Sequence, residues 1–501
     1  MKKAILYIPC LLLIFGTVQA VFGTAVAKSS AATYRVNISK DNPRLLKVTA
    51  EIAMNDDELY MSRNGAQQFP NRWAKFVRNL RVEDKRLRRL KVIDLGAARW
   101  KVEGAAKKVI TIRYEVVLDH EKHKWSGGID GAAFAKDWGV FYTGRSFLIM
   151  NGQDREDIKI SFDIPAGWKV SGSWSQTKPN GFVADNLNDL SESMFFAGTH
   201  EEFSINRGGF ELLFALGGKE IVAQKSKFRS LAQGVMDYYI DLMGGIPKSP
   251  PGNVFEKSIV IINSDSKMDG EVIGSHINMI FNPAGDEQSK IISKFIFAHE
   301  FFHLWNGKTI VAEKTTEDWF KEGVTSYYTL KALHHAGEIN DETYFGVLNN
   351  LFYQRYSNDK GYGKQSMRDV ADGFSKGEHW GLIYGGGLFV GLCQDISIRE
   401  NTSNKKSLDD LMRSYYRSYS GTSKSYSTAD MQASMTKFSG KDQSGFYKDY
   451  VYGVLPVPIT NCLSKAGLDA SIEKGQLKVS ARDNASALEK AILGGLLSGN
   501  N

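Results

Sequence analysis

The chain has 501 residues, of which 42% are hydrophobic, 12% aromatic and 24% charged, and this composition excludes a collagen-like chain, a disulfide-stapled miniprotein and a wholly disordered protein. At roughly 100–200 residues per domain, the length predicts two to four domains. The formal net charge of +7 is too small an excess of basic residues to require nucleic acid or an anionic membrane as a partner.

The first 27 residues have the pattern of a bacterial secretory signal. Lys2 and Lys3 precede the apolar residues 4–18, and small-x-small cleavage sites end at Ala20 and Ala27. An uncleaved membrane anchor is the alternative, but an apolar run of about 15 residues is short of the roughly 20 that span a bilayer. We therefore expect an exported protein, periplasmic or secreted, with no transmembrane segment in the mature chain and no nucleic-acid partner.

Two cysteines, Cys393 and Cys462, remain after this segment. An oxidising compartment would allow them to pair. Cys393, however, lies in an apolar stretch that is predicted to be helical, where a buried thiol is a common occurrence. We therefore expect a buried, unreactive thiol rather than a disulfide.

Residues 34–218 predict β-strands. The segments 109–118, 157–164 and 210–215 alternate or cluster β-branched and aromatic residues, with turn-forming residues at or near their ends. Several short strands separated by turn signals are typical of an antiparallel β-sandwich.

After residue 218 the periodicity becomes helical. Residues 226–243 carry apolar residues at helical spacing, and a glycine pair followed by a proline cluster ends the segment. Short strands are predicted at 258–262 and 277–281, and helices dominate from residue 290 to the mid-400s. A mixed region and then a mainly helical region therefore follow the strands.

One segment carries a metal-binding pattern. His299 and His303 are four residues apart, so on a helix both imidazoles can reach one metal ion. Glu300 lies beside that face, placed to take a proton from a metal-activated water and to return it to a leaving amine.

A catalytic zinc ion usually takes three protein ligands, and Glu322 is the candidate for the third. It follows His303 after 18 residues, on the next predicted helix. With nine histidines in 501 residues, chance matches are rare, which disfavours the alternative of two core histidines with an unrelated surface glutamate. Zinc is the expected metal because two imidazoles, one carboxylate and an open position suit it.

This pattern resembles the gluzincin clan of zinc metallopeptidases. The wording around His299 (HEFFHLWN) and around Glu322 (WFKEGVTSYY) is similar to the glycyl aminopeptidase family. Residues 383–399 resemble that family's Tyr-Tyr-x-Lys-Gly helix, which ends in Asp-x-x-Ile-Arg, and residues 407–413 its Ser-Leu-Asp-Asp segment. The similarity extends from the strand region to about Leu468.

The resemblance implies an α+β multidomain fold and a zinc-dependent peptidase. The implied parts are a signal peptide, an N-terminal antiparallel β-sandwich, a thermolysin-like zinc catalytic domain, a C-terminal α-helical domain and a tail without assigned structure, over residues 1–27, 28–220, 221–335, 336–468 and 469–501. It also implies one Zn²⁺ per chain, a peptide or protein substrate with a small first residue such as glycine or alanine, and oxyanion stabilisation by the Tyr384 hydroxyl. Ser326, four residues after Glu322, is placed to hydrogen-bond a zinc ligand.

Three departures from the family pattern affect specificity and domain content. Where relatives carry a Gly-Leu-Glu-His-like strand whose glutamate binds the free amino terminus, this chain has residues 274–278, without a carboxylate. Gly274, His276 and Asn278 remain candidate substrate contacts there, and Glu271 is the nearest acid. The family lysine is replaced by Gly386, and residues 469–501 are too few for a PDZ domain of about 90 residues.

The sequence thus predicts an exported zinc metallopeptidase that is aminopeptidase-like toward small N-terminal residues. Because the expected carboxylate is missing, an endopeptidase without a free N-terminus requirement is an alternative. A non-catalytic envelope binding protein on the same fold is a second alternative. It is disfavoured because such a protein has no chemical need for Glu300.

Overall fold

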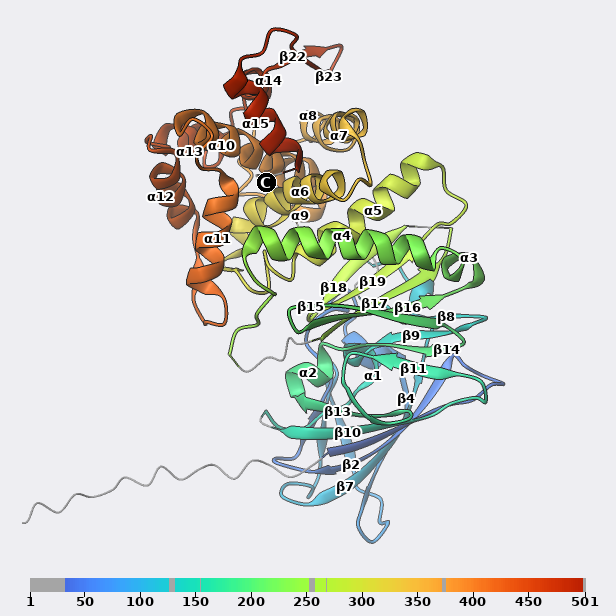
Figure 1. Ribbon diagram of the computed structural model, residues 1–501. Helices are drawn as coiled ribbons and strands as arrows, with labels where there is room; N and C mark the ends of the chain where they lie inside the picture. The colour runs from blue at the N-terminus through green and yellow to red at the C-terminus, as the bar shows by residue number, and fades with distance from the viewer. Residues whose placement is uncertain are drawn as a thin grey trace, which may run out of the picture.

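The computed structural model describes residues 32–125, 131–153, 155–251, 257–266, 268–371 and 375–498. The predicted signal sequence, residues 1–27, lies outside these described residues. The chain builds a β-rich N-terminal half, followed by a half in which helices dominate (Figure 1). This arrangement agrees with the α+β multidomain fold predicted from the sequence.

The N-terminal half is built on a seven-stranded sheet in the order β12-β13-β10-β1-β2-β7-β4. Its strands all pair antiparallel except β1 and β10, which are parallel. Two of the predicted strands, 109–118 and 157–164, are β7 and β10. The strands are β1 (Ala32–Ile38), β2 (Leu45–Ala53), β4 (Val77–Asp84), β7 (Val109–Val117), β10 (Glu156–Asp163), β12 (Ser175–Lys178) and β13 (Gly181–Asn186).

A four-stranded antiparallel sheet, in the order β11-β14-β9-β8, packs on the seven-stranded one. Period-2 alternation gives it two apolar faces. On β9, Tyr142 packs toward the seven-stranded sheet, whereas Phe141 packs on the opposite side against Ile259 and Ile261. The strands are β8 (Phe134–Lys136), β9 (Gly139–Thr143), β11 (Lys169–Gly172) and β14 (Met194–Gly198), and a small sheet holds β3 (Glu58–Tyr60), β5 (Val92–Gly96) and β6 (Arg99–Val102).

The next layer is a five-stranded sheet in the order β15-β16-β17-β19-β18, which leaves β18 at one edge. β15 (Glu201–Arg207) and β16 (Phe210–Gly217) form a hairpin, and β16 pairs in parallel with β17 (Lys257–Ser264). β19 (His276–Phe281) is parallel to β17, whereas β18 (Asp269–Ile273) is antiparallel to β19. The sandwich boundary predicted at residue 220 is therefore too late, because β15 and β16 belong to the catalytic sheet.

Helices cover the outer face of the five-stranded sheet (Figure 1). The long helix predicted at 226–243 is α4. The helices on this side are α3 (Lys219–Val222), α4 (Lys225–Met243), α5 (Glu287–Phe302), α6 (Asp318–His335), α7 (Asp341–Val347), α8 (Gln354–Ser357), α9 (Ser375–Glu378), α10 (Gly387–Asn401), α11 (Leu408–Tyr419), α12 (Thr428–Ser439), α13 (Ser444–Tyr450), α14 (Ile459–Ser464) and α15 (Ala487–Ser498), with two π-helical segments, η4 (Leu348–Tyr353) and η5 (Gly381–Gly386).

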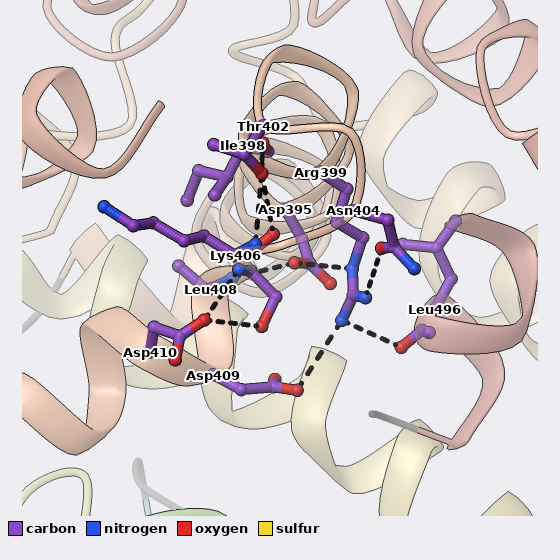
Figure 2. A network of polar contacts seen from close by, with 12 residues as sticks. Asp395, Ile398, Arg399, Thr402, Asn404, Lys406, Leu408, Asp409, Asp410 and Leu496 are labelled. Carbon is purple, nitrogen blue, oxygen red and sulfur yellow. Dashed lines mark hydrogen bonds and ion pairs between the residues drawn. The ribbon is translucent and has the colours of Figure 1, made fainter. Parts of the chain in front are cut away.

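A buried group of charges ties α6, α10 and α11 together. Figure 2 shows the part of it that Asp395, Arg399 and Asp409 form. Lys331 Nζ on α6 lies 3.0 Å from Asp409 Oδ1 on α11 and 3.6 Å from Asp395 Oδ2 on α10. Arg399 Nε is 3.0 Å from Asp395 Oδ1, and its NH2 atom donates to the carbonyl of Gly495 on α15. The four side chains are at most 2% exposed. Two cations and two anions balance here, so removing any one would leave an uncompensated buried charge.

Residues 469–501, predicted as a tail without assigned structure, pack on the body of the protein where they are described. β22 (Leu468–Glu473) and β23 (Gln476–Ala481) form a hairpin, and α15 follows it. The Tyr344 hydroxyl donates to the carbonyl of Leu496, and Gln354 donates to that of Gly475. This segment is therefore part of the helical half.

Cys393 on α10 and Cys462 on α14 form a disulfide, with their Cα atoms 5.3 Å apart. The expectation of an unpaired buried thiol was wrong. The two residues are 69 positions apart in sequence, and only the packing of α14 against α10 brings them together. The burial expected for Cys393 is correct, since it is 3% exposed.

One helical stretch among the described residues, Gly381–Asn401, is long and apolar enough to cross a membrane by length and composition. Its most apolar window is 89% buried inside the protein. That burial is typical of the core helix of a folded domain, where α10 lies against α6.

Candidate metal and catalytic site

α5 and α6 bring the three predicted metal ligands together. α5 begins at Asp286, whose side chain caps the helix by accepting from the Ser289 amide, and His299 and His303 lie at its other end. The Nε2 atoms of the two histidines are 3.1 Å apart, and Glu322 Oε2 lies 3.3 Å from His299 Nε2 and 3.1 Å from His303 Nε2. All three ligand atoms fall within 4.8 Å of one another.

The hydrogen bonds around these histidines fit a metal site. The Nδ1 of His303 lies 3.0 Å from the carbonyl of Asn306, which can only accept, so Nδ1 carries the proton and Nε2 keeps its lone pair. His299 Nδ1 is 3.4 Å from Ser326 Oγ, which donates its own proton to the carbonyl of Glu322. Ser326 therefore lies where the sequence predicted an outer partner, and both Nε2 lone pairs are free for one cation.

Burial and charge set the protonation states of the three ligands. Burial lowers the pKa of His299 to about 4, so the imidazole is neutral at neutral pH. Burial opposes ionisation of Glu322, but Lys376 and His303 outweigh it and hold the pKa of that carboxyl well below its usual range. Burial opposes the charged form of His303, but Glu322 and Glu300 outweigh it and raise the pKa of that imidazole, so a bound metal would replace a proton there. Two imidazoles and one carboxylate form a donor set that suits zinc.

Two glycines set the position of Glu322 relative to η5. A Cβ added to Gly323 would lie 2.5 Å from the amide nitrogen of Leu388 and still closer to the Cα and carbonyl carbon of Gly387. A Cβ on Gly387 would in turn collide with the backbone of Trp319. α6 and the start of α10 therefore touch through backbone atoms. Because η5 leads directly into α10, this contact brings Tyr384 toward Glu322.

Glu300 lies beside the metal ligands and under the edge strand. A Cβ added to Gly270 on β18 would lie 2.3 Å from Ile296 Cγ2 and 3.7 Å from Glu300 Cγ, so the strand packs closely over this face of α5. Burial raises the pKa of Glu300 to about 7. A carboxyl with that pKa can both accept and return a proton near neutral pH.

Tyr384 lies on a π-helical segment, a feature that often marks functional positions. Its ring stacks on Trp380 at 4.7 Å with the planes 3° apart, and its centroid is 5.9 Å from that of His299. Burial raises the pKa of Tyr384 well above its ordinary value, and Glu322 adds to the effect. Its phenol therefore stays protonated and can donate a hydrogen bond.

Lys376 is a site residue that the sequence analysis missed. Its ammonium group lies 2.6 Å from Glu322 Oε1 and 2.8 Å from Asp318 Oδ2, and 5.6 Å from the ring centroid of Tyr384. Because Oε1 is held in this way, Oε2 faces the histidines. No motif singles this lysine out, and 54 positions separate it from Glu322.

The predicted substrate contacts lie beside the edge strand rather than on it. Gly274 is in the turn between β18 and β19, and His276 is buried at the start of β19; both line a cavity of about 290 Å³ at the junction with the N-terminal half. Asn278 is fully buried on β19. The edge strand itself carries Glu271, which pairs with Asn278 across the ladder and accepts from the Gly131 amide at 2.6 Å.

Two solved structures share the fold of this chain. An aminopeptidase N family protein from Idiomarina loihiensis superposes with a TM-score of 0.75 at 20% identity, over 93% of this chain and 88% of that one. A point mutant of an M1 zinc metallopeptidase from Deinococcus radiodurans superposes with a TM-score of 0.50 at 12% identity, over 86% of this chain and 96% of that one. No curated protein matches the sequence.

Two family profiles match the sequence in the order in which the fold presents them. The Peptidase M61 N-terminal domain matches residues 33–199, the part that ends just before β15, and the M61 glycyl aminopeptidase profile matches residues 294–420, the part that carries the metal ligands and Tyr384. Together they cover more than half of the chain. The chain therefore belongs to the M61 glycyl aminopeptidase family and is a metallopeptidase, for which the family implies zinc.

Proposed function

We propose that this protein is an exported aminopeptidase that holds one zinc ion per chain and removes small N-terminal residues, such as glycine or alanine, from peptides or proteins. The observation that carries the proposal is the convergence of His299, His303 and Glu322 beside Glu300 and Tyr384. The three ligand atoms form an open triangle, and the two remaining groups are those that peptide hydrolysis needs.

Zinc, when bound, supplies a Lewis acid that polarises the scissile carbonyl and lowers the pKa of a water molecule. Glu300 then takes a proton from the attacking water and passes it to the departing amine, and its pKa of about 7 suits both transfers. The protonated Tyr384 phenol donates a hydrogen bond to the oxyanion of the tetrahedral intermediate. Lys376 keeps Glu322 oriented throughout.

Glu271 supports the preference for a free amino terminus. It is a carboxylate on the edge strand, next to Gly270, which lies over Glu300. A substrate ammonium group near this strand would pair with the carboxylate, and a blocked N-terminus would lose that pair. Residues 274–278 hold no carboxylate for the substrate ammonium group, and we propose that Glu271 provides it.

Export is supported by two features of the chain. Residues 1–27 have the pattern of a secretory signal. The disulfide between Cys393 and Cys462 suits an oxidising compartment such as the periplasm or the extracellular medium. A fractionation experiment that recovers the mature protein only from the cytoplasm would contradict this part of the proposal.

The activity can be tested with purified mature protein of known zinc content. Glycyl and alanyl chromogenic amides are compared with N-blocked peptides, and Glu300→Gln serves as the control that keeps the zinc ligands. We expect one zinc per chain and hydrolysis of free-amino substrates only. Cleavage of blocked peptides would indicate the endopeptidase alternative. Bound zinc without hydrolysis above the Glu300→Gln control would favour the binding-protein alternative.

A further inference from the structure

A cavity of about 470 Å³ lies between α5 and the α7–η4 segment. On α5 it is lined by Gln288, Ile292 and Phe295, which continue at helical spacing the face that carries His299. The cavity therefore lies on the same side of the helix as His299, beginning one turn before it. We call it the α5–η4 cavity.

A circuit of aromatic rings connects the lining of this cavity to the metal ligands. Phe295, which lines the cavity, stacks on His299 at 5.8 Å, and Phe352 connects Phe295 to Trp380 at 5.5 and 5.7 Å. Trp380 stacks on Tyr384, which returns to His299. Phe295, in the wall of the cavity, thus contacts the candidate ligand His299 directly. An extended peptide, at about 3.3 Å per residue, would reach the cavity within a few residues of the cleaved bond.

Arg355 presents the positive charge in this cavity. Its guanidinium lies 4.7 Å from the ring centroid of Trp380, and its side chain is exposed. Among the described residues no carboxylate lies within 4 Å of it. A guanidinium held flat on an indole has its hydrogen-bonding edge free to bind a carboxylate with two parallel bonds.

Glu342 and Arg355 both stand where their charge offsets a helix dipole. Glu342 lies in the first turn of α7, which Asn340 caps, and Arg355 lies in the last turn of α8. Of the two, Arg355 is the one that contacts the aromatic residues next to His299, through Trp380.

We propose that the α5–η4 cavity binds the part of the substrate that departs after cleavage, and that Arg355 is a specificity residue that binds a carboxylate there. This inference rests on the proposed peptidase function and adds its substrate class: short peptides with a free C-terminal carboxylate, or peptides with an acidic residue shortly after the cleaved bond. With the amino terminus near β18 and Glu271, we place the departing residues along the face of α5 that carries His299 and Phe295, on which this cavity lies.

The test compares three peptides on the zinc-loaded enzyme: Gly-Ala-Ala, its C-terminal amide, and the amide Gly-Glu-Ala-NH₂. For Arg355→Gln we expect KM to rise about fivefold to tenfold for a carboxylate-bearing peptide with little change in kcat, and both constants to stay unchanged for Gly-Ala-Ala-NH₂. Loss restricted to Gly-Ala-Ala identifies the chain terminus as the ligand, and loss restricted to the glutamyl peptide identifies the side chain. Arg355→Lys keeps the positive charge but cannot make two parallel hydrogen bonds, so its KM for the carboxylate-bearing peptides should lie between those of the wild type and Arg355→Gln.

Arg229→Ala is the matched control. Like Arg355, Arg229 lies over an aromatic ring, 4.5 Å from the centroid of Phe203, but it is on α4, away from the cavity. It should leave all three peptides unchanged. If Arg355→Gln lowers kcat for the amide peptide as strongly as for the others, Arg355 only supports Trp380 and the inference is wrong. Equal KM values for all three peptides in the wild type would also refute it, whereas no cleavage of any peptide would refute the proposed function itself.

Discussion

The close approach of α6 and the start of α10 predicts that Gly323→Ala damages both stability and metal binding. The added Cβ would lie 2.5 Å from the Leu388 nitrogen, whereas ordinary contacts begin at 3.4 Å. The helices must therefore separate by about 1 Å, because backbone atoms cannot rotate away as a side chain could. Overpacking of this kind costs about 3 kcal/mol, of which the better helix propensity of alanine recovers about 1 kcal/mol.

The same displacement moves Glu322 relative to Tyr384. A misplacement of about 1 Å at a catalytic group can cost about a hundredfold in rate. We therefore expect Gly323→Ala to lose about 2 kcal/mol of unfolding free energy in urea and to show weaker zinc binding and a lower kcat. Stability, zinc affinity and kcat are measured on the same preparation.

Gly494→Ala on α15 is the control, since nothing lies within 4 Å of its added Cβ. It should be neutral or stabilise the protein by up to about 1 kcal/mol. If Gly323→Ala has the same urea stability and zinc affinity as Gly494→Ala, the backbone contact of Gly323 with Gly387 and Leu388 does not set the site geometry.

Three further predictions follow from single contacts. Lys376→Met should weaken zinc binding about tenfold or more in a chelator competition, because Glu322 Oε1 loses its nearer cation and keeps only Lys321 at 3.5 Å. Lys360→Met, which breaks an exposed pair with Glu378, should not. His120 is buried and stacked on Phe76, and burial lowers its pKa to about 3, so below about pH 6.5 the unfolded state binds a proton that the folded state does not. His120→Phe should therefore reduce the loss of unfolding free energy on acidification by up to about 1.4 kcal/mol per pH unit. If urea unfolding shows the same loss between pH 7 and pH 5 for the variant and the wild type, this reasoning is wrong. Cys462→Ser should cost about 2–4 kcal/mol of unfolding free energy, and a reducing agent should then have no further effect.

The convergence of the candidate metal ligands was predictable because their signal is local. His299, Glu300 and His303 lie within two turns of one helix, so helical geometry alone determines which side chains share a face. Glu322 required only the assumption that the next helix packs on the first. Lys376 lies 54 residues from the ligand it holds, and nothing in the intervening sequence indicates that contact.

Strand order was beyond the sequence for a similar reason. The alternating pattern of β15 and β16 fits either sheet, and only the parallel pairing of β16 with β17 assigns the hairpin to the catalytic half. In the same way β18, with the sequence DGEVI, lacks a clear alternation, although it is the edge strand that carries Glu271. The proposed contact with the amino terminus of the substrate therefore falls on β18, at Glu271, whereas the sequence predicts contacts at residues 274–278.

The resemblance to the family extends beyond the residues that do chemistry, and the buried charges explain why. Asp395, Arg399 and Asp409 belong to the similar segments, yet they contact each other and Lys331 rather than the metal ligands. The hydroxyls of the two tyrosines that follow Glu322 on α6, residues 327 and 328, donate to Asp395 and Asp409. The helix that carries a zinc ligand is thus held at its other end by α10 and α11. A lost charge in this group would strain the packing of α6, so the metal geometry depends on residues that touch neither metal nor substrate.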